Sequence, residues 1–214
     1  MHTVSTLTGQ TWKRLDDRLR LIDEDRWLSS RYADLASRQA LVGLYLLNYE
    51  LARARLVVTE AGLGAIRFQW WREALDDAAS GDARRHEVTM ALAQQVAEGR
   101  LAIPALQKLL DEHEAAFEAK DRTLEPEARL AAIAAQVFAP AHGWGEEIVA
   151  LAPHCAALRR GEAVGFGPVV ATAPRDIRPA IAHFRLRRIM AKAGKSRAFA
   201  RRICVMRAML SGKV

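Results

Sequence analysis

Three groups of acidic side chains could bind a metal ion or act as catalytic acids and bases. They are Glu50 with Arg53 close by, the adjacent pair Asp76-Asp77, and the run Asp111-Glu112-His113-Glu114. Two carboxylates three or four residues apart lie on one face of a helix. Such hard oxygen ligands suit Mg²⁺, which can neutralise the negative charge of a leaving group. Chemistry of this kind needs at least two carboxylate pairs that face one cavity.

Structural roles compete with metal binding at the first two groups. Glu50 and Arg53 are spaced for an ion pair along one helix, and this interpretation is favoured over a ligand role. Asp77 falls near the end of a predicted helix, where a negative charge is unfavourable. We therefore expect Asp77 to have a basic partner elsewhere in the chain.

The third acidic group is better explained as a solvated helix face. Four consecutive residues spread around a helix, so only neighbours such as Asp111 and Glu114 share a side. Arg72 could bind a diphosphate with both ends of its guanidinium group, or it could pair with Asp76 four residues later. The sequence leaves both roles of Arg72 open.

Trp70 and Trp71 could line a channel for an apolar chain, because aromatic faces tolerate both apolar groups and cations. Neighbouring positions on a helix point about 100° apart, so only one of the two rings can face a given cavity. The favoured alternative places one ring in the core and packs the other against a neighbouring helix.

Helical periodicity runs through almost the whole chain, whereas the alternation typical of strands is nearly absent. The sequence therefore predicts an all-α fold. The expected helices cover about residues 11–28, 36–57, 60–79, 87–98, 104–119, 126–139, 146–160, 176–193 and 196–210, with a break at Gly194. Residues 161–174 are rich in glycine and proline and are predicted to form a loop.

A length of 214 residues fits one domain with a sizeable core, and we expect residues 1–214 to form a single helical domain. The longest apolar runs are far shorter than the ~18 residues needed to span a bilayer. No secretory leader is recognised. Cys155 and Cys204 belong to no metal-binding pattern, which favours buried thiols in a reducing compartment.

Positive charge is concentrated in the basic C-terminal segment, residues 174–214. This segment holds twelve lysines and arginines against one acid, Asp176, whereas the whole chain has a net charge of +7. The segment therefore predicts an anionic partner. Apolar side chains beside the arginines, among them Phe184, Phe199 and Leu210, would suit a membrane surface. They would equally suit a helical hairpin whose apolar side completes the core.

Several short segments share their order and spacing with a known family. They are Tyr45-Leu46-Leu47-Asn48, Gln69-Trp70-Trp71-Arg72-Glu73-Ala74-Leu75-Asp76, Gly81 and His86-Glu87-Val88. With these segments the sequence resembles the squalene/phytoene synthase family over roughly residues 25–137. Members of that family are all-α isoprenoid synthases, in which two aspartate-rich motifs on facing helices hold magnesium ions and, through them, substrate diphosphates. The resemblance implies an isoprenoid-synthase-like helical bundle.

The aspartates that the family uses are missing at the corresponding positions. If Tyr45 matches the family's tyrosine, the first motif falls near Ala52 and Leu56, neither of which can bind a metal. The counterpart of the second motif, around Arg160, carries only the acid Glu162. The chain is also shorter than usual members of the family, and we expect a truncated bundle.

One branch of the family has similar losses. It includes a mitochondrial assembly factor for respiratory complex I and its alphaproteobacterial relatives, and residues 48–52, Asn-Tyr-Glu-Leu-Ala, resemble that branch. The resemblance implies a protein that has lost metal-dependent prenyl transfer. Such a protein would act as a binding or assembly protein near a membrane, in the biogenesis of a respiratory complex.

Two other functions remain open. An active head-to-head prenyltransferase, which joins two isoprenoid diphosphates, would need Glu50, Asp76, Asp77 and Asp111 to supply its magnesium sites together. A basic nucleic-acid-binding helical protein would explain the charge of residues 174–214. That segment has two phenylalanines and no recognised nucleic-acid-binding module, which disfavours this class.

The resemblance places a cavity or diphosphate site, rather than a catalytic or metal site, at five residues: Tyr45, Glu50, Arg53, Trp71 and Arg72. No cofactor is expected, and Mg²⁺ would be required only by the prenyltransferase. The expected partners are an isoprenoid or lipid ligand and, through residues 174–214, an anionic membrane surface or an acidic protein. We expect the protein in the cytoplasm or the mitochondrial matrix, peripheral to a membrane.

Overall fold

The computed structural model describes residues 6–165, 167–193 and 198–214. Within these residues the chain forms helices, turns and loops, and no strand is present. The chain is divided into two compact units. Unit 1 comprises Met1–Ile22 and Leu35–Pro126, and unit 2 comprises Asp23–Asp34 and Glu127–Val214. The single domain predicted over residues 1–214 stays a prediction.

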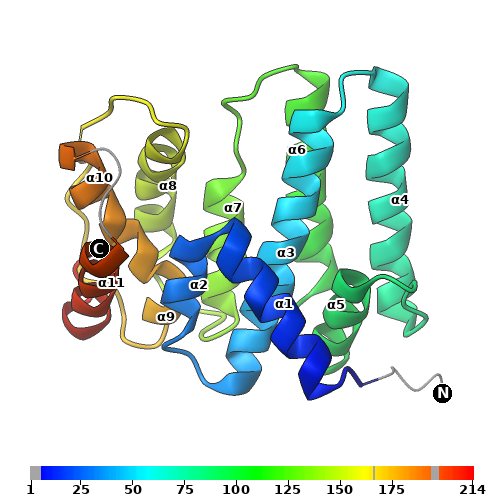
Figure 1. The fold of residues 1–214 in the computed structure, drawn as a ribbon, viewed down its shortest axis with the longest axis horizontal. Coiled ribbons are helices and arrows are strands. Elements are labelled where there is room, and N and C mark those ends of the chain that lie inside the picture. Colours follow the sequence, from blue (N-terminus) through cyan, green and yellow to red (C-terminus); the bar gives the residue numbers. More distant parts are fainter. Residues whose placement is uncertain (1–5, 166, 194–197) are drawn as a thin grey trace. The chain divides into compact units, whose positions relative to one another are not determined.

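Unit 1 is built around one long helix that other helices surround. Its described helices are α1 (Gly9–Ile22), α3 (Leu35–Val57), α4 (Ala61–Ser80), α5 (Glu87–Ala97) and α6 (Ile103–Glu118). The helix α3 contacts α1, α4, α5 and α6, and α4 runs beside α6 (Figure 1). Leu41, Leu44 and Leu46 point to different sides of α3 and are all buried, as is typical of a helix enclosed by its neighbours.

The helices α4 and α6 approach closely at Gly64. The ring of Phe117 packs on the α4 backbone there, and a Cβ atom at position 64 would lie 2.1 Å from Cζ of Phe117. Only glycine leaves room for this ring. Phe117 also meets Phe68, with the ring centres 5.7 Å apart. These contacts join the start of α4 to the end of α6.

Unit 2 contains shorter helices and the basic segment 174–214. Its described elements are α2 (Glu24–Ser30), α7 (Glu127–Gln136), α8 (Gly145–Arg159), α9 (Arg178–Ile181), the 3₁₀ turn η1 (Ala182–Leu186), α10 (Arg187–Ala193) and α11 (Ala198–Ser211). The helix α7 packs on α8 and α9, and η1 packs on α2, α8 and α11. Ile181, Phe184 and Leu186 are buried. The basic segment therefore contributes to the core of unit 2.

One long helix predicted for residues 11–28 is wrong, because α1 ends at Ile22 and α2 starts at Glu24. Asp23 causes the break. Its side chain accepts a hydrogen bond of 3.2 Å from the backbone N–H of Arg26, which caps the first turn of α2.

The helix predicted for residues 176–193 is also broken, into α9, η1 and α10. Pro179 lies in the first turn of α9, and Ile181 leaves helical geometry with φ −125° before the tighter 3₁₀ turn. The predicted break at Gly194 lies outside the described residues.

Lys120 follows the end of α6 and adopts the left-handed backbone conformation, with φ 54°. No other described non-glycine residue has a positive φ. The N–H of Lys120 donates to the carbonyl of Phe117, which closes the helix end. We expect Lys120→Gly to raise the free energy of unfolding by about 0.5–1 kcal/mol, because glycine adopts this conformation without Cβ strain. Urea denaturation measures the change. Lys108→Gly, inside α6, is the control and should destabilise instead, so a loss of stability in both variants would contradict the prediction.

Candidate functional site

Glu50 is held by arginines from two helices of unit 1. In the second half of α3, its carboxylate forms an ion pair with Arg18 of α1. Its other oxygen lies 4.0 Å from Nη1 of Arg53. Both guanidinium groups also lie 5.9 Å from the centre of the Tyr49 ring. The predicted pair with Arg53 is therefore present, but Arg18, 32 residues earlier in the chain, is closer.

Trp71 lies beside a histidine that was not among the predicted site residues. The ring of His86, at the start of α5, is 5.6 Å from the centre of the buried Trp71 ring and 5.9 Å from that of Trp70. Burial lowers the pKa of His86; nearby Glu50 opposes this shift and Arg18 adds to it. His86 thus packs against Trp71, and the charges of Glu50 and Arg18 act on it.

The two tryptophans divide as expected between the core and a neighbouring segment. Trp71 is buried, whereas Trp70 is partly exposed and lies under the guanidinium group of Arg84, 5.2 Å from its ring centre. The two rings meet edge to face, with their centres 4.9 Å apart.

Arg72 binds carboxylates of α6 rather than the nearby Asp76. Its guanidinium donates to Asp111 at 2.8 Å and to Glu114 at 2.6 Å. The hydrogen bond to Asp111 is the main cause that raises the pKa of Arg72. Asp111 and Glu114 share a side of α6, as expected, and Arg72 uses both to fasten α4 to α6.

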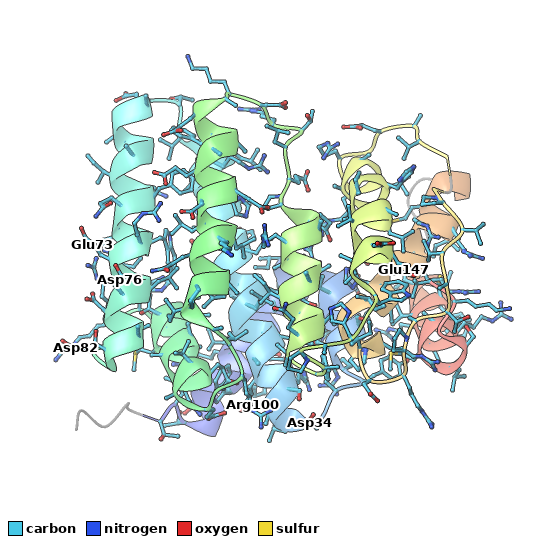
Figure 2. The ribbon with its side chains drawn as sticks, turned by 180° about the vertical axis from the view of Figure 1, so that it is seen from behind. Asp34, Glu73, Asp76, Asp82, Arg100 and Glu147 are labelled. Atoms are coloured by element: carbon cyan, nitrogen blue, oxygen red, sulfur yellow. The ribbon has the colours of Figure 1, made fainter. Side chains whose placement is uncertain are left out.

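The remaining acids of α4 also have partners. Asp76 accepts a hydrogen bond of 2.7 Å from Gln107 of α6. Asp77 accepts one of 2.7 Å from Arg84, which also binds Glu73 at 2.8 Å. Figure 2 shows Glu73 and Asp76 on α4. The expected basic partner of Asp77 is therefore Arg84.

The acids that a prenyltransferase would need do not form a shared magnesium-ligand set. Glu50, Asp76, Asp77 and Asp111 each bind a different arginine or glutamine side chain. The described part of the chain holds no group of three or more His, Cys, Asp or Glu side chains arranged to bind a metal ion. Three of these acids form ion pairs with arginines, and Asp76 accepts a hydrogen bond from Gln107.

Two of the five predicted ligand residues, Tyr45 and Glu50, lie on different sides of α3. Tyr45 is buried on α3, five residues before Glu50 and therefore about 140° away around the helix. Trp71 packs against His86, whereas Arg72 faces α6. The ligand role predicted for these residues stays a prediction.

A buried charge cluster in unit 2 was not predicted from the sequence. Arg26 of α2 forms ion pairs with Asp23 and with Glu127, the first residue of α7. Arg159 of α8 lies 3.4 Å from Glu127 and 3.3 Å from Asp23, and His183 of η1 lies 3.9 Å from Glu127. The side chains of Arg26, Glu127 and His183 are nearly inaccessible to solvent.

The pKa values in this cluster show that its carboxylates remain charged. Burial alone would raise the pKa of Glu127, but Arg26 and Arg159 outweigh burial and hold it well below its usual range. The same balance lowers the pKa of Asp23 to about 2. Burial lowers the pKa of His183, and the neighbouring carboxylates of Glu127 and Asp23 oppose this shift. Two acids and two arginines thus balance each other in charge.

The region around Arg160, the expected counterpart of the family's second aspartate motif, contributes to this cluster through Arg159. Its neighbour Arg160 instead pairs with Glu162 at 2.6 Å. The spacing of these residues along α8 gives no sign of Glu127 or Asp23, because those partners lie 32 and 136 residues away in sequence.

Asp23 gives unit 2 an acid-sensitive stability. Its folded-state pKa of about 2 lies below the unfolded value of 3.8, so its contribution is complete above pH 4 and is lost as the pH falls through 2. We expect wild type to exceed Asp23→Asn by about 2 kcal/mol in free energy of unfolding at pH 6. The difference should nearly vanish at pH 2. Urea titrations at both pH values measure it, and a difference independent of pH would contradict this role.

The squalene/phytoene synthase family model matches residues 19–137, more than half of the chain. The chain belongs to this family. The match covers α2 to α7, with Tyr45, Glu50, Trp71 and Arg72. The expected fold class, all-α and isoprenoid-synthase-like, is therefore confirmed.

A curated relative has the expected name. The chain is 31% identical over 96 residues to NADH dehydrogenase (ubiquinone) complex I, assembly factor 6, of Bos taurus. These residues make up 45% of this chain and 29% of the relative, so the match spans less than a third of that protein. No solved structure matches the chain significantly.

Proposed function

We propose that this member of the squalene/phytoene synthase family is a binding or assembly protein for a respiratory complex and has lost metal-dependent prenyl transfer. The observation that carries the proposal is the pairing of Glu50. This carboxylate lies next to the positions expected for the first aspartate motif, which hold Ala52 and Leu56, and it binds Arg18 and Arg53. The name of the bovine relative supports the assembly role.

Calorimetry with farnesyl diphosphate tests the loss of catalysis. We expect no binding that depends on Mg²⁺ and no condensation product, because a guanidinium-paired carboxylate is a poor ligand for a dication. Arg18→Gln, which frees one side of Glu50, serves as a second sample. Magnesium-dependent binding with turnover by wild type, abolished by Glu50→Gln, would establish the prenyltransferase instead.

Complementation tests the assembly role. Deletion in the source organism should reduce assembled respiratory complex I on native gels, and wild type should restore it. Glu50→Gln should restore it as well, since the proposed role needs no metal-binding carboxylate. An unchanged complex in the deletion strain would rule out the assembly role, and a failure of folded Glu50→Gln would point to chemistry at Glu50.

The helix α11 supports a location at an anionic membrane surface. None of the described helices combines the length and the apolar character needed to cross a bilayer. Phe199, Met206 and Leu210 are nevertheless exposed along one side of α11, and the first and last are 73% and 75% exposed. Arg202 and Arg207 are exposed nearby. Apolar side chains flanked by cations suit the interface of an anionic bilayer in the cytoplasm or the mitochondrial matrix.

Liposome flotation tests this surface. We expect binding to anionic vesicles that weakens with salt and is lost in the double variant Phe199→Glu, Leu210→Glu. Leu21→Glu in α1, at an apolar side chain that is 85% exposed, is the matched control and should bind like wild type. Equal binding of all three proteins would remove α11 from the proposal. Salt-steep binding to DNA without lipid binding would favour the nucleic-acid alternative.

A further inference from the structure

The first two turns of α4 are open to solvent on almost every side. Every residue from 61 to 67 is exposed except Gly64, which is covered by the ring of Phe117. Further along α4, Phe68 and Trp71 begin a buried side that packs within unit 1. A surface helix normally buries a continuous apolar stripe, so the open start of α4 is available to another surface.

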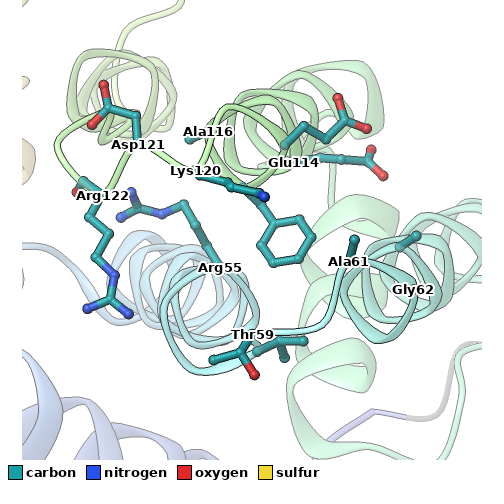
Figure 3. Close-up of a pocket in the computed structure, with 13 residues that line it drawn as sticks. Arg55, Thr59, Ala61, Gly62, Glu114, Ala116, Lys120, Asp121 and Arg122 are labelled. Carbon is teal, nitrogen blue, oxygen red and sulfur yellow. Dashed lines mark hydrogen bonds between the residues drawn. The ribbon is translucent and has the colours of Figure 1, made fainter.

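A cavity borders one side of these turns. It has a volume of about 740 Å³ and lies among the end of α3, the start of α4 and the end of α6 (Figure 3). Ala61, Gly62 and Ala65 are the residues of α4 that line it. Leu63 comes two residues after Ala61 and therefore lies about 200° around the helix from it. The cavity and Leu63 thus lie on opposite sides of α4.

Exposed apolar side chains are grouped where α3 ends and α4 begins. Leu63 and Ile66 are 53% and 66% exposed in the first turns of α4. Leu56 and Val57 are exposed at the end of α3, and only residues 58–60 separate them from α4. A single exposed leucine is ordinary, but several exposed apolar side chains at one corner of a structure indicate a contact surface.

Two charged side chains of opposite sign stand at the ends of this start of α4. Glu60 is its N-cap residue and makes no side-chain capping hydrogen bond, and Arg67 lies almost two turns later. Both are exposed, and neither side chain has a hydrogen bond or ion pair within the part of the chain that the structure describes. By contrast, Arg72 and the three acids further along α4 all have partners.

Glu60, Leu63 and Arg67 share one side of α4. Seven residues make almost two complete helical turns, so Glu60 and Arg67 lie within about 20° of each other around the helix. They are roughly 10 Å apart along its axis, which is too far for a direct ion pair. Leu63 lies between them. This side of α4 therefore presents an acid, an apolar side chain and a base in that order.

A surface with this order of charges is complementary to itself. When a second copy of α4 lies antiparallel against the first, Glu60 of each copy faces Arg67 of the other, and the two Leu63 side chains meet in the middle. The two copies are then related by two-fold symmetry, which is the commonest symmetry of homo-oligomers. An anionic bilayer fits the same surface less well, because it would repel Glu60.

We propose that two copies of this chain associate through the start of α4, antiparallel to each other, with Glu60 of each copy paired to Arg67 of the other. Leu63, Ile66 and the exposed end of α3 supply the apolar contact between these pairs. Exposed ion pairs add little to affinity, but they fix the orientation of the two helices. This contact involves neither Glu50 nor α11, so it goes beyond the proposed function and can fail alone.

Sedimentation equilibrium of the whole chain tests the association. The average mass should rise from the chain mass of 23.7 kDa towards twice that value as the protein concentration is raised from micromolar to millimolar. Salt should weaken the association, because it screens the exposed pairs. A mass that stays at 23.7 kDa over the whole range would overturn the proposal.

Two apolar surfaces are compared to locate the contact. The double variant Leu63→Glu, Ile66→Glu should weaken self-association by at least ~10-fold, whereas Ala79→Glu, exposed near the end of α4, should leave it unchanged. The double variant Phe199→Glu, Leu210→Glu should associate like wild type. Association lost only in that second double variant would place the contact at α11 and overturn the proposal. Circular dichroism confirms that each variant is folded.

Exchange of the two charges tests the antiparallel orientation. Glu60→Arg and Arg67→Glu should each weaken self-association by about 3–30-fold, because like charges then face each other at both ends of the contact. An equimolar mixture of the two variants should regain the association, since every changed charge then faces its opposite on the other copy. A mixture that associates no better than either variant alone would overturn the proposed arrangement.

Asp82→Arg and Arg85→Glu are the matched controls for this exchange. Both positions are exposed and follow the other end of α4. Self-association should match that of wild type in each variant and in their mixture, and equal losses in these controls would trace the effect to net charge instead. Wild-type binding to anionic vesicles that is lost in Leu63→Glu, Ile66→Glu would show that a bilayer covers this surface, and would likewise overturn the proposal.

Discussion

Glu127→Ala is expected to lower the free energy of unfolding by about 3–5 kcal/mol, because it leaves Arg26 buried without its partner. The side chains of Arg26 and Glu127 are 2% and 4% exposed, so water cannot replace the lost carboxylate. Asp23 remains as the second partner of Arg26, but it also serves Arg159 and the first turn of α2. The expected loss of stability therefore arises at the buried centre of unit 2.

Thermal denaturation measures this effect. For a chain of this length, the expected loss corresponds to a decrease of about 6–20 °C in Tm. Glu146→Ala, at an exposed acid near the start of α8, is the control and should change stability by less than about 1 kcal/mol. A loss below 1 kcal/mol for Glu127→Ala would show that the cluster is not a stabilising element.

A double variant separates the loss of a partner from the loss of volume. Glu127→Leu with Arg26→Met removes both charges and keeps apolar side chains of similar length. Replacing a buried ion pair in this way is often neutral or stabilising. We expect the double variant to be more stable than Glu127→Ala, whereas equal instability would trace the loss to packing instead.

The helices were predictable where apolar residues repeat at helical spacing over a long stretch. The predicted helix of residues 36–57 differs from α3 by one residue at its start, and the predicted loop of residues 161–174 contains no described helix. Only one of the two adjacent tryptophans, Trp71, is buried, as the 100° step between helical neighbours predicts. In these places local pattern and tertiary packing agree.

The breaks at Asp23 and within residues 176–193 were missed because periodicity continues across them. Asp23 is followed by Glu24 and Asp25, a helix-start signal that could have been recognised. The 3₁₀ turn η1 has no comparable signal. Its geometry arises from packing against α2, α8 and α11, which a local pattern does not contain.

The partners of the candidate site residues could not be found from spacing. Within a helix, spacing proposes Arg53 for Glu50 and Asp76 for Arg72. The structure supplies Arg18 and the acids of α6, which other helices bring into place. The basic segment shows the same limit, because net charge does not reveal which cations are already bound inside the fold.

Arg178 is the clearest case of a cation used inside the basic segment. Its guanidinium donates to the carbonyls of Ala173, Met209 and Leu210 at 3.2, 2.9 and 3.1 Å. The last two lie in the final turn of α11, where carbonyl groups lack partners within the helix and attract positive charge. One side chain thus fastens the end of α11 to the start of α9.

The chain passes close to this arginine at Gly212. A Cβ atom at position 212 would lie 2.8 Å from Nη2 of Arg178 and 2.8 Å from the carbonyl of Ala173. The backbone there is left-handed, with φ 67°, and the carbonyl of Gly212 accepts a hydrogen bond of 2.9 Å from the N–H of Ala173. Glycine at 212 and arginine at 178 therefore form one structural unit.

We expect Arg178→Met to lower the free energy of unfolding by about 2–3 kcal/mol, since it removes several charge-assisted hydrogen bonds but leaves carbonyls that water can partly reach. Urea denaturation measures the loss. Arg175→Met, at an exposed arginine three residues earlier, should change stability by less than about 0.5 kcal/mol.

Flotation provides the converse comparison, because Arg202→Met should weaken binding to anionic vesicles by removing an exposed cation. Folded Arg178→Met should float like wild type, and a loss of flotation with unchanged stability would show that Arg178 serves the membrane instead.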